Sequence, residues 1–308
     1  MNGSTSTAAT RVFAVSDVHA DHRENMTWLR ALSAADYRDA ALILAGDVSD
    51  DLAALDVALT CVRRKFAEVF FVPGNHELWI RRRECADSLA KFRRVLQLCD
   101  DVGVRTRPAT VGRGATAVWI IPLLSWYVRP EEGPDSLFVA KDGEDPTLAM
   151  WSDKYFTAWP PLNGSPTVAQ HFLALNEPHL AATYDAPVIS FSHFLPRRDL
   201  IFSTPAERRD VGVPLRDPHP TFNFSRVAGC AGLETQIRRL GSLVHVYGHQ
   251  HRNRDRVIDG VRYVSHCLGY PRERRDWYAR GAAGGPTPIE VPATAGPAGG
   301  GLLNTTHM

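Results

Sequence analysis

The sequence predicts an α/β fold in which helices cover a parallel sheet. Short apolar runs at residues 11–16, 41–45 and 68–72 each end at polar turn residues. Between them, residues 25–35 and 52–65 place apolar side chains at helical spacing. This β-α-β-α-β order is typical of parallel strands joined by crossover helices. The loops after such strands are the usual place for a binding site.

Elements of the same two kinds are expected further along the chain. Residues 81–98 have the pattern of a long amphipathic helix rich in arginine, and residues 115–124 that of a buried strand. Asp259-Gly260 is a strong signal for a two-residue hairpin turn. The remaining strands are expected at residues 188–192, 243–247, 256–258 and 261–265.

The pattern loosens between residues 127 and 186, where Pro, Gly and acidic residues alternate with aromatic side chains. We interpret this segment as a lid-like insertion with a helix at residues 168–183; the alternative is a satellite cluster that covers a sheet edge. The arginine- and proline-rich residues 196–231 are expected to border the site. The predicted organisation is a flexible N-terminus at 1–10, one domain at 11–280 and a disordered tail at 281–308.

The overall composition fits a soluble enzyme. Among 308 residues, 35 are basic and 34 acidic, so no overall field attracts a polyanion and general nucleic-acid binding is not expected. Residues 1–10 lack the apolar core of a secretory signal. The longest apolar stretch, residues 117–128, contains Pro122 and is too short to cross a bilayer. Five scattered cysteines without a CxxC pair favour a reducing, cytoplasmic location.

Five short stretches carry Asp, Asn and His in an order suited to two adjacent metal ions. Three of them follow directly on the apolar runs of the opening units. A carboxylate and an imidazole one residue apart can hold the same ion, and Asp47 has two oxygens with which to bridge two ions. Such mixed N/O ligands suit Mn, Fe, Zn, Co or Ni. The candidate ligands are Asp17, His19, Asp47, Asn75, His193, His249 and His251.

Hydrolysis at phosphorus is the reaction that such a pair of ions fits best. Two divalent ions about 3.5–4 Å apart lower the pKa of a bridging water and stabilise both the entering and the leaving oxygen. His76 is next to Asn75 and is not needed as a ligand. We therefore expect His76 to protonate the leaving oxygen or to stabilise the charged transition state.

Taken in order, the motifs DxH, GDxxD, GNHE, a lone strand-end His and GHxH resemble the calcineurin-like metallophosphoesterase family. They stand at residues 17–19, 46–50, 74–77, 193 and 248–251. The sequences of residues 74–79 and 270–274 resemble those of a poorly characterised branch of that family, whose members are stand-alone domains.

The resemblance implies a four-layer α/β/β/α sandwich of two mixed sheets, with a dinuclear site at the strand ends. It also implies that His76 is the catalytic imidazole and that Asp50 orients its ring. Asp47 would be the bridge. By position, one ion would be held by Asp17, His19, Asp47 and His251, and the other by Asp47, Asn75, His193 and His249.

Four further residues are candidates for substrate binding. Arg197 and Arg198 follow His193 closely and could hold phosphate oxygens, with a solvated loop as the simpler alternative. Trp126 and Tyr127 end a predicted strand and could stack on a leaving group, with core packing as the alternative.

The leading functional hypothesis is a phosphoesterase that hydrolyses a small-molecule phosphate ester by attack of a metal-bridging hydroxide on phosphorus. A monoester is slightly favoured over a diester, because local arginines could hold a dianionic group. One alternative is a phosphoprotein phosphatase, which would need an open groove. Another is a non-catalytic scaffold that keeps the fold and the metals.

Overall fold

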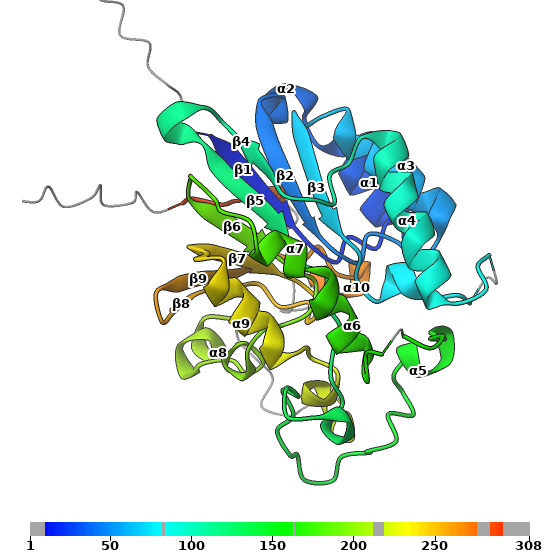
Figure 1. Cartoon of the computed structure of the whole chain (residues 1–308). Helices are drawn as coiled ribbons and strands as arrows, with labels where there is room; N and C mark the ends of the chain where they lie inside the picture. Colours follow the sequence, from blue (N-terminus) through cyan, green and yellow to red (C-terminus); the bar gives the residue numbers. More distant parts are fainter. Residues whose placement is uncertain (1–9, 82–83, 163, 212–218, 276–283, 292–308) are drawn as a thin grey trace, which may run out of the picture.

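Two mixed β-sheets pack face to face in the computed structural model, and helices cover both outer faces (Figure 1). The model describes residues 10–81, 84–162, 164–211, 219–275 and 284–291. The four-layer α/β/β/α sandwich implied by the motifs is confirmed.

The first sheet has the order β10-β1-β2-β3. Strands β1 (Arg11–Val15), β2 (Ala40–Ala45) and β3 (Glu68–Val72) are parallel, as predicted, and β10 (Thr287–Pro288) runs antiparallel to β1. β10 corrects the prediction of a disordered tail for this stretch. Ile289 beside it is buried between the sheets and anchors this stretch to the core. Residues 1–9 and 292–308 lie outside the described part of the chain.

Four helices belong to the first half of the chain: α1 (Arg23–Ala31), α2 (Ala34–Tyr37), α3 (Leu52–Arg63) and α4 (Ser88–Val102). The prediction that α4 begins at Arg81 is wrong. Its N-cap is Asp87, whose side chain accepts a hydrogen bond from the amide of Ala90 at 2.7 Å and so satisfies an amide of the first turn. Arg81 instead forms an ion pair with Asp50.

The side chains of β2 alternate between two cores, because successive residues of a strand point to opposite faces. Leu42 and Leu44 pack among the residues of α1, α3 and α4. Ile43 and Ala45 face the second sheet. All six residues of β2 are buried, as expected for a strand covered on both sides.

The second sheet has the order β4-β5-β6-β7-β9-β8. Its four central strands are parallel, and the two edge strands run antiparallel to their neighbours. Helix α9 (Ala231–Arg239) packs on its outer face through Leu233 and Ile237. The strands are β4 (Ala109–Val111), β5 (Val118–Pro122), β6 (Val188–Phe191), β7 (Val244–Tyr247), β8 (Arg254–Ile258) and β9 (Val261–Ser265).

The segment 127–186 folds into short helices and an aromatic cluster. The single helix predicted at 168–183 is divided into α6 (Val168–Leu175) and α7 (Glu177–Leu180). The buried side chain of Asn176, between them, bonds both the amide and the carbonyl of Leu124 at 2.9 Å. The other short helices are α5 (Asp153–Phe156), α8 (Pro205–Val211), α10 (Pro271–Arg275), η1 (His76–Leu78), η2 (Gly114–Thr116), η3 (Pro130–Glu132), η4 (Arg198–Leu200) and η5 (Phe224–Arg226).

Within the described residues, no helix combines the length and the apolar character needed to span a bilayer. All five cysteines are free thiols, three of them buried.

Candidate metal centre

All seven predicted ligands meet at the carboxyl ends of parallel strands. Asp17 and His19 follow β1, Asp47 follows β2, and Asn75 follows β3 in the first sheet; His193 follows β6, and His249 and His251 follow β7 in the second. The two sheets are aligned so that these loops share one edge of the sandwich. Side chains that are 234 residues apart at the extremes are therefore neighbours.

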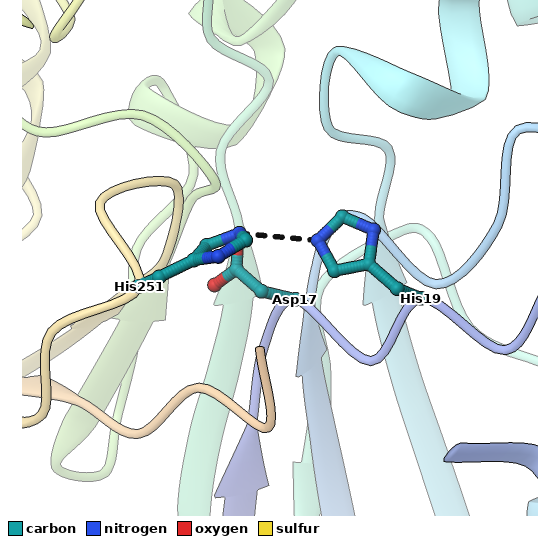
Figure 2. Close-up of side chains that lie close together, drawn as sticks. All are labelled: Asp17, His19 and His251. Carbon is teal, nitrogen blue, oxygen red and sulfur yellow. Dashed lines mark hydrogen bonds and ion pairs between the residues drawn. The ribbon is translucent and has the colours of Figure 1, made fainter. Parts of the chain in front are cut away.

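One group of potential ligands consists of Asp17, His19 and His251. Figure 2 shows the three side chains converging from the loops after β1 and β7. The Nε2 atoms of His19 and His251 are 3.1 Å apart, and Nε2 of His251 is 3.3 Å from Asp17 Oδ1.

A second group consists of Asp47, His193 and His249, with Asn75 beside them. Nε2 of His193 lies 3.3 Å from Asp47 Oδ2, 3.1 Å from Asn75 Oδ1 and 3.2 Å from His249 Nδ1. Asp47 also lies within reach of His19 and His76. It is therefore the carboxylate that stands between the two groups.

Hydrogen bonds behind the imidazoles decide which nitrogen faces the centre. His193 donates from Nδ1 to the carbonyl of Ala45, and His249 from Nε2 to that of Val227, both at 2.9 Å. His251 Nδ1 lies 2.7 Å from a carboxylate oxygen of Glu273. A neutral imidazole that donates from one nitrogen presents a lone pair at the other. With these tautomers, the lone pairs of neutral His193 Nε2 and His249 Nδ1 face one another at 3.2 Å and repel unless a cation lies between them, so this donor set fits a metal ion.

Burial favours the neutral, metal-binding form at two of the four imidazoles, His19 and His249, whereas Asp17 and Glu273 raise the pKa of His251 well above its usual value against the effect of burial. Burial lowers the pKa of His249 to about 3 and the pKa of His19 well below its usual value. Burial acts in the same direction on His193, but the Asp47 carboxylate outweighs it and raises the pKa of His193 to about 9. The negative charge of Asp47 thus attracts a cation into the centre of the site.

Five of the potential ligands have left-handed backbone conformations. Their φ angles lie between 45° and 73°, in a region that costs a residue with a side chain about 1 kcal/mol or more. Only Leu148 and Asp259 share this conformation among the other non-glycine residues described. The five ligands are Asp17, His19, Asp47, His249 and His251.

Two motif glycines allow the close approach of these loops. A Cβ atom at Gly46, whose φ is 81°, would collide with the ring of His193. A Cβ atom at Gly74 would collide with the carboxylate of Asp47 and the ring of His193. Both positions need glycine for space, and Gly46 needs it for its backbone as well.

Glu77 holds the loop of Asp47 from behind. Its buried carboxylate accepts four backbone N–H bonds, from Asp47, Val48, Ser49 and Gly74, at 2.6–2.9 Å. Burial and the neighbouring Asp47 raise the pKa of Glu77 to about 7, against the effect of the amide donors. The last residue of the GNHE motif thus joins the loops after β2 and β3.

His76 lies at the surface of the centre, where substrate can reach it. Its Nε2 is 3.8 Å from Asp47 Oδ2 and 3.5 Å from the hydroxyl of Tyr270, and its ring packs on Trp79 with 3.7 Å between the ring centroids. Burial lowers the pKa of His76. In the described part of the chain, no hydrogen bond joins it to Asp50, whose partner is Arg81. The expected orientation of His76 by Asp50 is not observed.

The four residues predicted to bind substrate face elsewhere. Arg197 forms ion pairs with Asp199, Glu234 and Asp259, and Arg198 donates to the carbonyl of Ser136. Their charges are thus engaged away from the site.

Trp126 and Tyr127 are buried and pack against Phe194. They border a smaller cavity of about 280 Å³ and do not line the cavity of the metal centre. The core-packing alternative is therefore the one observed for this pair.

Three residues of the site escaped the sequence-based prediction. The ring of Tyr270 stacks on His19 with 4.4 Å between ring centroids, and Glu273 supports His251. Tyr270 and Glu273 belong to residues 270–274, whose sequence resembles one branch of the family but was assigned no role. Asp153 accepts hydrogen bonds from Asn75, Trp79 and Trp151, and burial raises its pKa to about 6. An isolated Asp in an irregular segment carries no motif by which it could be found.

The centre opens into a cavity of about 800 Å³. Met150 and Trp151 contribute to its wall from segment 127–186, and Phe202 and Phe222 from segment 196–231. Arg252 and Arg272 also line it. Both segments therefore border the site, as predicted for residues 196–231, and they give it an aromatic wall next to His249.

Comparison with known proteins agrees with this geometry. The family model for calcineurin-like phosphoesterases matches residues 10–253. A curated relative, [acyl-carrier-protein] phosphodiesterase PptH of Mycobacterium tuberculosis, is 28% identical over 315 residues, which cover 96% of this chain and 90% of the relative.

A solved structure has the same architecture. The crystal structure of phosphopantetheinyl hydrolase (PptH) from Mycobacterium tuberculosis matches with a TM-score of 0.65 and 25% identity, covering 89% of this chain and 96% of that one. The chain belongs to the calcineurin-like phosphoesterase family of metal-binding hydrolases.

Proposed function

We propose that this protein is a phosphodiesterase that uses two divalent or mixed-valence metal ions. The observation that carries the proposal is the convergence of seven N/O side chains next to one cavity, with Asp47 between two groups of the others. Asp47 is assigned as the bridge. One ion is assigned to Asp17, His19, Asp47 and His251, and the other to Asp47, Asn75, His193 and His249. Such a pair of ions supplies an activated water and charge stabilisation at phosphorus.

The residues of the chain supply the remaining chemistry. His76 lines the cavity beside Asp47, so its Nε2 is available to give a proton to the leaving oxygen as the P–O bond breaks. Trp79 limits the motion of the His76 ring by packing against it. The aromatic wall contributed by Trp151 and Phe222 reduces access of bulk water to the scissile bond.

The substrate we propose is a phosphodiester with a long, weakly polar arm. Arg197 and Arg198, on which the preference for a monoester depended, are held by other partners away from the cavity. Arg252 and Arg272 do line it, so the choice of a diester rests on the named activity of the relative and on the apolar wall. A diester carries one negative charge less and has two substituents, one of which can lie along the apolar wall. The relative PptH, which is named an acyl-carrier-protein phosphodiesterase and a phosphopantetheinyl hydrolase, supports a phosphopantetheinyl group on an acyl-carrier protein as that arm.

Two assays test the proposal. Metal-stripped protein reconstituted with Mn²⁺ should hydrolyse bis-p-nitrophenyl phosphate faster than p-nitrophenyl phosphate. It should also convert a phosphopantetheinylated carrier protein to the free serine form, which mass spectrometry detects as loss of one phosphopantetheine. Faster hydrolysis of the monoester would contradict the choice of a diester. If the carrier protein keeps its phosphopantetheine group after prolonged incubation, this group is not the long arm of the substrate.

A further inference from the structure

Asp153 lies directly behind the ion site that contains Asn75, although it belongs to segment 127–186 and to none of the family motifs. It is the first residue of α5 and is 1% exposed. Three side-chain N–H groups point at its carboxylate. Asn75 Nδ2 and Trp79 Nε1 donate to Oδ1 at 2.9 and 2.7 Å, and Trp151 Nε1 donates to Oδ2 at 3.0 Å.

These bonds determine which end of the Asn75 amide faces the centre. A carboxylate only accepts, so it binds the NH₂ end of the amide and turns the carbonyl oxygen the other way. That oxygen, Oδ1, lies 3.1 Å from Nε2 of His193, on the side where the ligands meet. Without Asp153, the amide could rotate and present its NH₂ group to a cation, which would repel it.

Trp151 extends the same support to another ligand of that ion. Its indole is perpendicular to the ring of His249, with 5.7 Å between the centroids, and it stacks on Phe222 at 5.5 Å. The Asp153 hydrogen bond holds the indole in this place. The described contacts of Asp153 thus reach two residues assigned to one ion, Asn75 directly and His249 through Trp151, and none that belongs only to the other.

We infer that Asp153 is a positioning residue by which segment 127–186 sets the affinity of the ion site formed by Asp47, Asn75, His193 and His249. The inference depends on the proposed metal-binding role of Asn75. It makes the segment part of the metal centre as well as a wall of the cavity. Through Trp79, which packs on His76, the same carboxylate also supports the proposed proton donor.

Two substitutions separate hydrogen bonding from packing. Asp153→Leu keeps a similar bulk but removes both acceptor oxygens. Asp153→Asn keeps one oxygen, which can still accept from Asn75 and Trp79, and leaves an NH₂ group facing the donor of Trp151. Asp145→Asn is the control, since Asp145 lies in the same segment, caps Thr147 on the surface and touches none of the ligands.

Mn²⁺ binding to metal-stripped protein is the readout, measured by titration calorimetry and electron paramagnetic resonance. We expect D153L to bind one Mn²⁺ normally and the other about 10–100-fold more weakly, the usual cost of losing the partner of a metal ligand. At limiting Mn²⁺, the electron paramagnetic resonance spectrum of D153L should be that of isolated ions instead of a spin-coupled pair. D153N should show a smaller loss at the same site, and D145N none.

A double variant tests whether Asp153 acts through Asn75. If it does, D153L weakens Mn²⁺ binding less in the N75A background than in the wild type, because only the contact through Trp151 is still there to be lost. Wild-type affinity in D153L, equal weakening of both sites, or full additivity in the double variant would each overturn the inference. If D153L does not fold, D153N decides, and unchanged binding at both sites there also overturns it. A wild type that binds no Mn²⁺ overturns the proposed function itself.

Discussion

Replacing Glu77 with Gln should destabilise the protein severely, although the two side chains have the same shape. The four backbone N–H groups around Glu77 are shared equally by its two oxygens. Gln has one oxygen, so two of these amides would face an NH₂ group. Each buried donor left without an acceptor costs about 1–3 kcal/mol, which gives about 2–6 kcal/mol for the pair.

Thermal unfolding at about pH 8, where Glu77 is mostly ionised, measures this loss. In a chain of 308 residues, 1 kcal/mol corresponds to a shift in Tm of about 2 °C, so E77Q should unfold about 4–12 °C below wild type. Glu24→Gln is the matched control, because Glu24 is exposed and its nearest cation is 3.9 Å away. Equal Tm values for E77Q and E24Q would refute the role given to these four bonds.

Three further predictions concern catalysis by His76, acid stability and Arg197, which the structure places away from the cavity. His76→Ala should lower kcat about 10²–10⁴-fold while the bound metal, measured by atomic emission, remains at the wild-type level. His245 is buried between Ser190 and Ser192, and burial lowers its pKa to about 3. Below about pH 6.5 this histidine is therefore protonated in the unfolded state but stays neutral in the folded state. Stability should fall by about 1.4 kcal/mol per pH unit from this group as the pH drops from about 6.5 towards 3, and urea unfolding of His245→Gln should show a slope smaller by that amount. Arg197→Ala should keep the kcat/KM of wild type and lose about 1–3 kcal/mol of stability, because its side chain is only 18% exposed and its removal leaves the half-buried Glu234 with one charged donor fewer; a large rise in KM would restore it as a substrate-binding residue.

Local sequence patterns were sufficient for the opening units because burial on both faces leaves its mark within a few successive residues. β2 and β3 are covered on both faces, so they appear as uninterrupted apolar runs, and the polar residues after them mark the shared edge of the sheet. The ligands follow these strand ends directly. The fold class and the positions of Asp17, Asp47 and Asn75 could therefore be predicted.

What escaped prediction depends on contacts between distant segments. Asp153 bonds Asn75, which is 78 residues away, and no periodicity encodes that pairing. β10 forms because β1 leaves an edge to which two late residues can bond. Arg197 was assigned to phosphate because of its nearness to His193 in the chain, but three carboxylates from other parts of the fold hold it. A charged side chain faces its strongest partners, and these are not visible in sequence order.

The left-handed backbone at the ligands implies a conflict between stability and activity. Glycine adopts positive φ without strain, so replacing a ligand such as Asp17 or His251 with glycine would relieve about 1 kcal/mol at that position. Hydrogen bonds offset this strain in the folded chain, such as those that the Asp17 carboxylate accepts from the amide of His249. Aspartate and histidine at such angles thus indicate loops shaped for the metal centre, and a relative without that centre should tolerate glycine or asparagine at these five positions.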